Sequence, residues 1–427
     1  MRVLTMVLLT VRFAAAAPLA DFDQGVRTEP ILEDARQSAG TSSDEGALWV
    51  SLSRADLSGA RAAGLPLGSP IRMSDTTAVF EVPSDILPRL SDFMHESAGR
   101  CGGFFAYRTR VEAESSLSVR SGSKGGPYTL DQQALVSSLV SRVGEEGIRS
   151  TIETLAAFNN RYYAAESGAD AARWLQGRWQ ALAQGLPGAT SRLVPHEGWK
   201  QPSVVLTIPG SEKPEEIVVL GGHLDSINGW RGASARAPGA DDNASGIAVL
   251  TEAVRVLGAS GLRPRRTIQF MGYAAEEVGL RGSQDLARQA AREGRKVVGV
   301  IQYDMTNFRG SGEGIFLLDD FVDPALTAFL GKLIEAYVGV PWSTTECGYA
   351  CSDHASWTKS GYPASAAFES TFDSMNHAIH TERDTLATSG GSAEHSVAFA
   401  RLAVAFAVEL AKASSEPPLP VPTLTSR

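Results

Sequence analysis

The spacing of apolar residues changes along the chain and divides it into two parts. Near the N-terminus, short apolar runs at 49–52 and 78–82 predict β-strands, and the stretch 83–95, with Ser84 as a possible cap, predicts a short helix. The Gly- and Ser-rich stretch 115–126 then has the composition of a flexible linker. We therefore expect a small α+β domain that ends near residue 126.

Beyond residue 126, helical and strand-like segments alternate. Leu135, Leu139 and Val143 recur every four residues, as they do on one face of a helix. The predicted strands are 204–208, 217–220, 267–271, 297–303 and 365–368, and the predicted helices are 170–182, 244–257, 279–293, 324–338 and 395–413. This alternation predicts an α/β domain over 127–415, with a mostly parallel central β-sheet flanked by helices.

The two ends of the chain differ from these segments. The apolar run 3–11 follows Arg2 and precedes the small residues 14–17, which is typical of a signal peptide over 1–17. Arg12 weakens the match, and a buried N-terminal strand or helix is the alternative. The tail 416–427 is rich in proline. We expect a secreted protein, and the sequence leaves open whether it stays in a periplasm.

Composition excludes two classes of partner. The chain has 427 residues, of which 43% are hydrophobic and 20% charged, so it can bury a large core. Its formal net charge is -9 and it has no long basic run, which argues against a nucleic-acid partner. No apolar stretch reaches the ~18 residues that a membrane span needs.

Polar residues follow several predicted strands at one edge of the sheet. Taken singly, a histidine at a strand end is more often structural, an Asp-Asp-Asn run is usually a helix cap, and adjacent glutamates usually form a solvated turn. Here, however, such residues follow strand after strand, and the carboxyl ends of parallel strands are where ligands bind. Imidazole and carboxylate groups gathered at that edge indicate a divalent-metal site. The residues are His223, Asp225, Asp241, Asp242, Asn243, Glu276, Glu277, Asp304 and His380.

Four motifs together resemble the secreted bacterial leucyl aminopeptidases, which are two-zinc enzymes with a zinc exopeptidase fold. They are Gly-Gly-His-Leu-Asp-Ser at 221–226, Ala-Pro-Gly-Ala-Asp-Asp-Asn-Ala-Ser-Gly at 237–246, Tyr-Ala-Ala-Glu-Glu-Val-Gly-Leu-Arg-Gly-Ser at 273–283 and Cys-Gly-Tyr-Ala-Cys-Ser-Asp-His-Ala-Ser-Trp at 347–357. The resemblance covers about 130–413, and the preceding segment is more weakly similar to the propeptide of that family.

The resemblance implies a role for seven of these polar residues. It implies two Zn²⁺ ions per chain, which activate a water, and a general base that does not bind metal, Glu276. Asp225 would orient one of the metal-binding histidines. The implied ligands are Asp241 as the bridge between the ions, His223 and Asp304 at one ion, and Glu277 and His380 at the other.

The resemblance also implies an apolar substrate pocket. Ordinary core packing is an equal alternative for each of its wall residues, Met305, Leu318, Tyr349, Phe368, Phe372 and Ile379. Ala366 and Met375 depart from the family pattern, which predicts a wider pocket and a less strict preference for leucine. Cys347 and Cys351 are close enough in the chain to form a disulfide in an exported protein, and Cys101 is then left over.

The sequence thus predicts a hydrolase, a secreted zinc metallo-aminopeptidase that removes N-terminal residues, preferably large and apolar, from peptides with a free N-terminus. We expect a monomer, and residues 18–126 are expected to form a propeptide and linker that make the chain a zymogen. A permanent accessory domain is the alternative for that segment. The alternative functions are a one-zinc glutaminyl cyclase of the same fold, and a non-catalytic binding protein, which should have lost ligands or the base.

Overall fold

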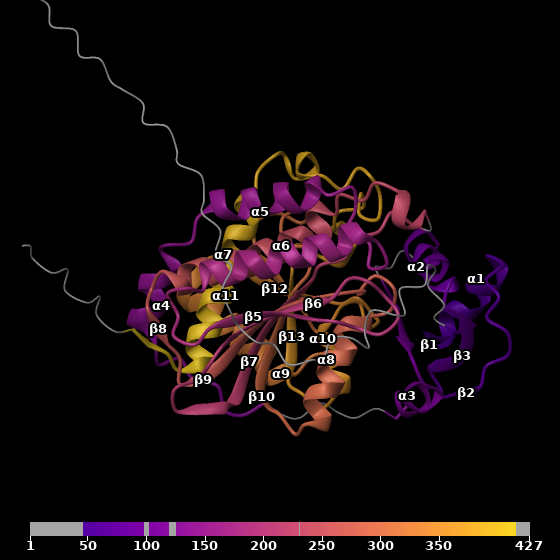
Figure 1. Ribbon diagram of the computed structural model, residues 1–427, viewed down its shortest axis with the longest axis horizontal. Helices are drawn as coiled ribbons and strands as arrows, with labels where there is room; N and C mark the ends of the chain where they lie inside the picture. Colours follow the sequence, from indigo (N-terminus) through magenta and orange to yellow (C-terminus); the bar gives the residue numbers. More distant parts are fainter. Residues whose placement is uncertain (1–45, 98–101, 119–124, 230, 416–427) are drawn as a thin grey trace, which may run out of the picture. The chain divides into compact units, whose positions relative to one another are not determined.

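The computed structural model describes residues 46–97, 102–118, 125–229 and 231–415 (Figure 1). The predicted signal peptide 1–17, Cys101, residues 119–124 of the predicted linker and the tail 416–427 lie outside the described residues.

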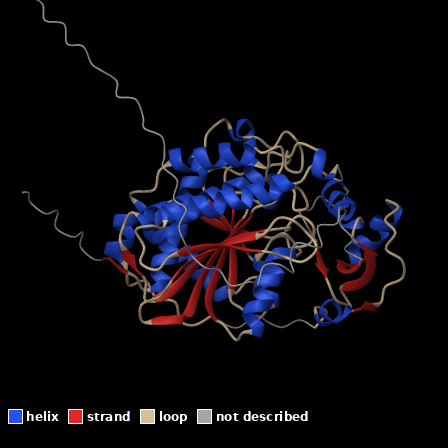
Figure 2. Ribbon diagram, viewed as in Figure 1, coloured by secondary structure: helices blue, strands red, loops and turns tan. Residues whose placement is uncertain are grey.

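A mixed sheet forms the centre of the larger part (Figure 2). It has eight strands, in the order β12-β11-β13-β10-β7-β9-β6-β5. The pairs β7–β9, β7–β10, β10–β13 and β11–β12 are parallel, and β5–β6, β6–β9 and β11–β13 are antiparallel. The predicted mostly parallel sheet is therefore confirmed. Its strands are β5 Thr190–Val194, β6 Ser203–Ile208, β7 Lys213–His223, β9 Arg266–Tyr273, β10 Lys296–Tyr303, β11 Ile315–Leu318, β12 Trp342–Thr345 and β13 Ala364–Phe368.

Both faces of the sheet are covered, and β7 shows why its sequence suits the middle. Val218 and Leu220 point into the core on one face, whereas Ile217 and Val219 point into the core on the other. A strand that is buried on both faces reads as a continuous apolar run rather than as an alternation. The run therefore predicts a central strand, and β7 pairs with β9 and β10 on its two sides.

The helices form a layer on each face. One layer contains α4 Gln133–Val140, α5 Glu145–Ala157, α6 Glu166–Leu182, α7 Gly246–Gly258, α9 Pro324–Leu333 and α11 Glu394–Ala411, whose apolar residues share one core. The other contains α8 Arg281–Arg292 and α10 His354–Lys359. Figure 1 shows α5, α6, α7 and α11 together on one side. None of the described helices is long and apolar enough to cross a membrane.

Some predicted boundaries are wrong for local reasons. The helix expected over 279–293 begins at Arg281, because Gly279 and Leu280 both have positive φ angles, of 106° and 56°, and form a turn. The strands β5, β11 and β12 were not predicted from the apolar pattern. The short strands β8 Leu262–Arg263 and β14 Ser414–Ser415 pair with each other outside the main sheet.

The N-terminal part has its own antiparallel sheet, in the order β2-β3-β1-β4, which confirms an α+β arrangement. Its elements are β1 Ala47–Ser53, α1 Leu57–Ala62, β2 Arg72–Met73, β3 Thr77–Pro83, α2 Ile86–Glu96, β4 Phe104–Tyr107 and α3 Arg110–Ser115. Its hydrophobic core also includes Tyr163, Trp199 and Val278 from beyond the predicted boundary. Residues 43–427 accordingly form one compact unit, and the boundary at 126 stays a prediction.

Packing of α11 against the sheet should dominate stability, so Phe406→Ala should destabilise the fold strongly. Phe406 is fully buried, and Gly299 of β10 leaves room for its ring. Losing a buried aromatic ring of this kind costs about 3–5 kcal/mol. Denaturant unfolding would measure the change, with Arg401→Ala on the same helix as the control, which should change stability by less than about 0.5 kcal/mol. A loss below about 1 kcal/mol for Phe406→Ala would contradict the packing described.

Candidate metal centre

Two groups of potential metal ligands meet at the carboxyl ends of the central strands. One group is His223, Asp242 and Asp304, and the other is Asp242, Glu277 and His380, each with donor atoms within 4.8 Å of one another. His223 is the last residue of β7, and Asp304 directly follows β10. The sheet therefore brings together the predicted ligands His223, Glu277, Asp304 and His380, as their positions after predicted strands indicated.

Asp242 belongs to both groups because its two carboxylate oxygens face different histidines. Oδ1 lies 2.9 Å from Nε2 of His223, and Oδ2 lies 3.2 Å from Nε2 of His380. Around them, Asp304 Oδ1 is 3.3 Å from His223 Nε2, and Glu277 Oε2 is 2.7 Å from His380 Nε2. A carboxylate shared in this way has the geometry of a bridge between two cations.

The assignment of Asp241 as the bridge is wrong. Its Oδ1 accepts a hydrogen bond from the backbone N–H of Asn307 at 3.0 Å, and its Oδ2 accepts one from Nδ2 of Asn376 at 3.1 Å. Its carboxylate also shares a hydrogen bond with Glu369. Consecutive side chains on this turn point in different directions, so only one of the two aspartates can reach the histidines. Asp242, and not Asp241, is the carboxylate that the two candidate ligand groups share.

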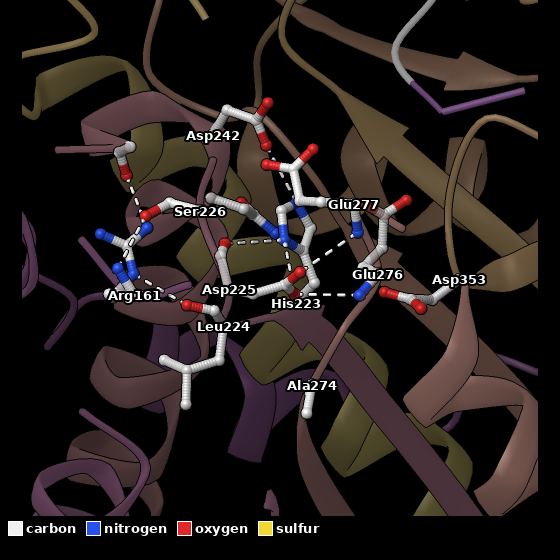
Figure 3. A network of polar contacts seen from close by, with 12 residues as sticks. Arg161, His223, Leu224, Asp225, Ser226, Asp242, Ala274, Glu276, Glu277 and Asp353 are labelled. Carbon is white, nitrogen blue, oxygen red and sulfur yellow. Dashed lines mark hydrogen bonds and ion pairs between the residues drawn. The ribbon is translucent and has the colours of Figure 1, made fainter. Parts of the chain in front are cut away.

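Asp225 lies behind His223, as expected, and has a second role that the sequence did not indicate. The nearest acceptor for His223 Nδ1 is the backbone oxygen of Asp225 at 3.2 Å, with its carboxylate Oδ1 at 3.6 Å. That carboxylate also accepts the backbone N–H groups of Glu276 at 3.0 Å and Glu277 at 3.2 Å (Figure 3). Asp225 therefore ties the loop of the ligand His223 to the loop that carries both glutamates.

Two further residues that sequence reasoning missed hold the turn at Asp242. Asp384 accepts the backbone N–H groups of Asp241 at 3.1 Å and Asp242 at 3.0 Å. The buried guanidinium of Arg161 donates to the carbonyls of Leu224 at 2.8 Å and Gly239 at 2.8 Å, which joins the loop after β7 to the same turn (Figure 3). Asp384 lies within the polar run after His380, and this position could have indicated its role. No feature of the sequence around Arg161 distinguishes it from the other arginines.

The protein groups of this site carry more negative charge than they can balance among themselves. Burial, reinforced by Asp353, Glu277 and Asp304 and opposed by His223, raises the pKa of Glu276 well above its usual value. Burial and Asp242 raise the pKa of Glu277 to about 7. Burial works against the charged form of His223, but the nearby carboxylates outweigh it and raise its pKa. A bound cation would relieve this repulsion.

Unsatisfied atoms indicate the same kind of ligand. Within the described part of the chain, Oε1 of Glu277 is buried and has no hydrogen-bond partner. The other buried donor atoms, His223 Nε2, Asp304 Oδ1 and Glu277 Oε2, meet only the opposing groups of the histidine–carboxylate pairs described above. A buried polar atom without a partner costs about 1–3 kcal/mol. A divalent cation accepts lone pairs from all of these atoms, so the residues present fit a pair of metal ions that share Asp242.

Glu276 is placed differently from its neighbour, although both follow β9. Figure 3 shows the side chain of Glu277 directed toward Asp242, whereas that of Glu276 lies on the side of Asp353. Both oxygens of Glu276 are buried and form no hydrogen bond among the described residues, and Glu276 belongs to neither ligand group. This arrangement suits a base that acts on water beside the metals, which is the role predicted from the sequence.

The predicted pocket residues lie together beside Asp304. Their cluster also includes Ala366 and Met375, and its members are Met305, Leu318, Tyr349, Phe368 and Ile379, with Phe372 partly buried against it. The cavity among them has a volume of only about 10 Å³, too small for a side chain. The expected wider pocket is therefore absent from this closed arrangement, although the residues that would form its walls are in place.

The predicted disulfide is confirmed. Cys347 and Cys351 are bonded, and they enclose a loop that carries Tyr349. The ring of Tyr349 meets that of Phe372 edge to face, with 5.9 Å between the ring centroids. The disulfide thus holds an aromatic side chain at the rim of the apolar cluster.

The chain matches the model of "Peptidase family M28" over residues 203–405. It is similar to a probable leucine aminopeptidase of the fungus Trichophyton verrucosum, with 39% identity over 318 residues, 73% of this chain and 86% of that protein. Among solved structures it resembles the LapA aminopeptidase of Legionella pneumophila, with TM-score 0.74 and 29% identity over 86% of this chain and 98% of that one. LapB of the same organism gives TM-score 0.74 and 31% identity, over 86% and 99%.

Exchanging each of the adjacent aspartates should separate their roles. Asp242→Asn should weaken metal binding more than about 100-fold, because changes to residues that only support a ligand already cost about 10–100-fold. Asp241→Asn is the matched control and should lose less than about 100-fold, since Asp241 only supports the turn that carries Asp242. Emission spectrometry of the dialysed proteins would measure bound metal. Equal metal loss in the two variants, or full metal content in Asp242→Asn, would contradict the bridge.

Proposed function

Since the chain belongs to peptidase family M28 and is a metallo-aminopeptidase, we propose that it uses two zinc ions to remove large apolar residues from the N-termini of peptides outside the cytoplasm. The observation that carries the proposal is the position of Asp242, with one oxygen in each of two ligand groups. A glutaminyl cyclase that works with one zinc has no need of such a bridge. A binding protein that had lost catalysis would lack the ligands or Glu276, and this chain has them all.

The donor set supports zinc in particular. Each group offers one imidazole and two carboxylates, which suits a borderline cation rather than Mg²⁺ or Ca²⁺, which prefer oxygen ligands alone. Three protein ligands for each ion leave coordination positions open, as a catalytic site requires. His223 and Asp304 would hold one ion, Glu277 and His380 the other, and Asp242 both.

The bound zinc pair would supply the Lewis acid for the scissile carbonyl and lower the pKa of a water molecule. The remaining chemistry belongs to Glu276. Its carboxylate accepts the proton that the attacking water gives up, and it returns a proton to the nitrogen that leaves when the peptide bond breaks. Asp225 fixes this base, because it holds the backbone N–H of Glu276 at 3.0 Å.

The apolar cluster beside Asp304 supports a preference for large apolar N-terminal residues. Met305, Leu318 and Phe368 line the small cavity that opens from Asp304, so a side chain held there would lie next to the metals. Ala366 and Ala367 are small residues in the same wall, so the pocket can widen when the neighbouring aromatic rings move. We propose that peptide substrates bind with their first side chain in this cluster.

The N-terminal domain covers the metal centre, which supports its role as a restraining propeptide. The ring of His95, near the end of α2, packs on that of His380 with 4.5 Å between centroids. A Cβ atom on Gly102 would lie 3.9 Å from Oε1 of Glu276, so this backbone passes directly beside the base. A Cβ atom on Gly103 would lie 2.5 Å from the side chain of Met94 and 3.4 Å from that of Tyr349. A peptide cannot occupy the same space.

We also propose export and a monomeric state. The disulfide between Cys347 and Cys351 is typical of proteins that fold in an oxidising compartment. The apolar run at 3–11 with small residues after it supports a signal peptide. The metal centre is assembled within one chain, so it needs no residue from a second copy.

Glu276→Gln should lower kcat by about 10²- to 10⁴-fold and leave the metal content unchanged. The amide keeps the shape of the side chain but cannot accept the proton. Glu277→Gln is the matched control at the neighbouring position and should lose metal as well as activity. Hydrolysis of leucine p-nitroanilide and metal analysis of the same samples would measure both effects. Near-normal turnover by a metal-replete Glu276→Gln protein would exclude the role as base.

Limited proteolysis within residues 115–129, which include the predicted linker 115–126, should raise kcat/KM more than about tenfold, because the covered state cannot bind substrate. Peptidase activity would be measured before cleavage, and again after cleavage and removal of the N-terminal fragment. Glu276→Gln protein cut in the same way should stay inactive, which controls for activity of the added protease. Full activity of the intact chain, unchanged by a clean cut, would instead assign 18–126 as a permanent accessory domain.

A further inference from the structure

A second and much larger cavity lies between the N-terminal sheet and the face of the main sheet that carries α8 and α10. Its volume is about 830 Å³, and none of the metal-site residues lines it. Phe105 and Val111 contribute from the N-terminal part, and Phe321 and Val322 from the opposite wall. Phe321 and Val111 keep 38% and 74% of their surface exposed, so the cavity and its rim present apolar groups that no described residue covers.

One cation in this cavity has no counter-charge among the residues that the structure describes. The ammonium of Lys359, at the end of α10, lies 3.5 Å from the centroid of the Phe105 ring and 3.5 Å from the hydroxyl of Tyr107. Within the described residues it forms no ion pair with a carboxylate. Burial lowers its pKa to about 7. A desolvated ammonium without an anion is costly, and an anionic ligand would remove that cost.

The acidic residues around the cavity are already engaged. Glu112 caps α3 through the backbone N–H of Thr109 and lies 3.6 Å from the guanidinium of Arg288. Asp323 accepts the backbone N–H groups of Leu326 at 2.7 Å and Gly125 at 3.1 Å. The charge left to be satisfied is therefore positive, and it sits at the end of an apolar space.

We propose that this cavity binds a fatty acid, with the carboxylate on Lys359 and the alkyl chain against Phe105, Val111 and Phe321. Binding sites for small ligands typically measure about 300–1,000 Å³ and have mainly apolar walls. This cavity has such a volume and a mainly apolar lining surface, to which polar side chains, including Lys359, Arg288 and Arg292, also contribute. Because Phe105 and Tyr107 belong to the N-terminal domain, the ligand would contact both parts of the chain. This inference goes beyond the peptidase function and does not depend on it.

Calorimetric titration of the full chain with dodecanoate tests the proposal. Lys359→Met keeps the length of the side chain and should weaken dodecanoate about 10- to 100-fold, which is the usual loss of one hydrogen bond to a charged group. Lys332→Met, at an exposed lysine on α9, is the matched control and should bind like the original protein. Butanoate should bind more than about 100-fold more weakly than dodecanoate, because each buried CH₂ group strengthens binding about fourfold.

Thermal unfolding of Lys359→Met separates a binding defect from a folding defect. Removing a half-buried charge that has no carboxylate partner among the described residues should leave the Tm unchanged or higher. If Lys359→Met bound dodecanoate as tightly as the original protein does, the lysine would have no role in binding. The same would follow if the original protein bound dodecanol, which has no carboxylate, as tightly as dodecanoate. Equal affinity for butanoate would overturn the role of the apolar walls. If the original protein binds dodecanoate only with a Kd above about 1 mM, or not at all, the proposed binding site is wrong. Peptidase activity enters none of these readouts.

Discussion

The carboxylate of Asp242 meets two imidazoles at once, and the arrangement of the whole metal centre depends on it. His223 comes from the end of β7 and His380 from the loop after β13, so one side chain joins distant segments. A buried carboxylate is stable only when positive charge or hydrogen-bond donors compensate it and when the backbone that carries it is fixed in position. Asp384 holds it through backbone N–H groups, and Arg161 holds the same turn through carbonyl oxygens. The site is thus fixed by backbone contacts as well as by its ligands.

The fold supplies this centre at one edge of a sheet that is buried on both faces. Apolar residues on β7 and its neighbouring strands pack against the two helical layers. The polar groups of the site therefore lie at the ends of the strands. In the described arrangement the centre is also closed, because His95 packs on His380 and the adjacent apolar cavity measures only about 10 Å³. Under the proposed role of the N-terminal domain as a restraining propeptide, catalysis would require this domain to move or to be removed, which connects the architecture of the chain to its proposed regulation.

The alternation of strands and helices, and the polar residues after the strands, were sufficient to predict the mostly parallel sheet and four residues of the two candidate ligand groups. Position along the chain could not decide between Asp241 and Asp242, because the direction of each side chain depends on the turn before α7. Arg161 was missed because its partners are carbonyl groups, which leave no trace in residue types. Short strands such as β11 and β12 were missed because tertiary pairing rather than apolar pattern defines them.

The central claim is that Asp242 bridges two zinc ions, and anomalous X-ray diffraction at the zinc absorption edge tests it most directly. The account predicts two anomalous peaks, one beside His223 and Asp304 and the other beside Glu277 and His380, with an Asp242 oxygen at each. Two ions bridged by a carboxylate are expected about 3.5–4 Å apart. A single peak in zinc-replete crystals, or a pair of peaks bridged by Asp241, would contradict it.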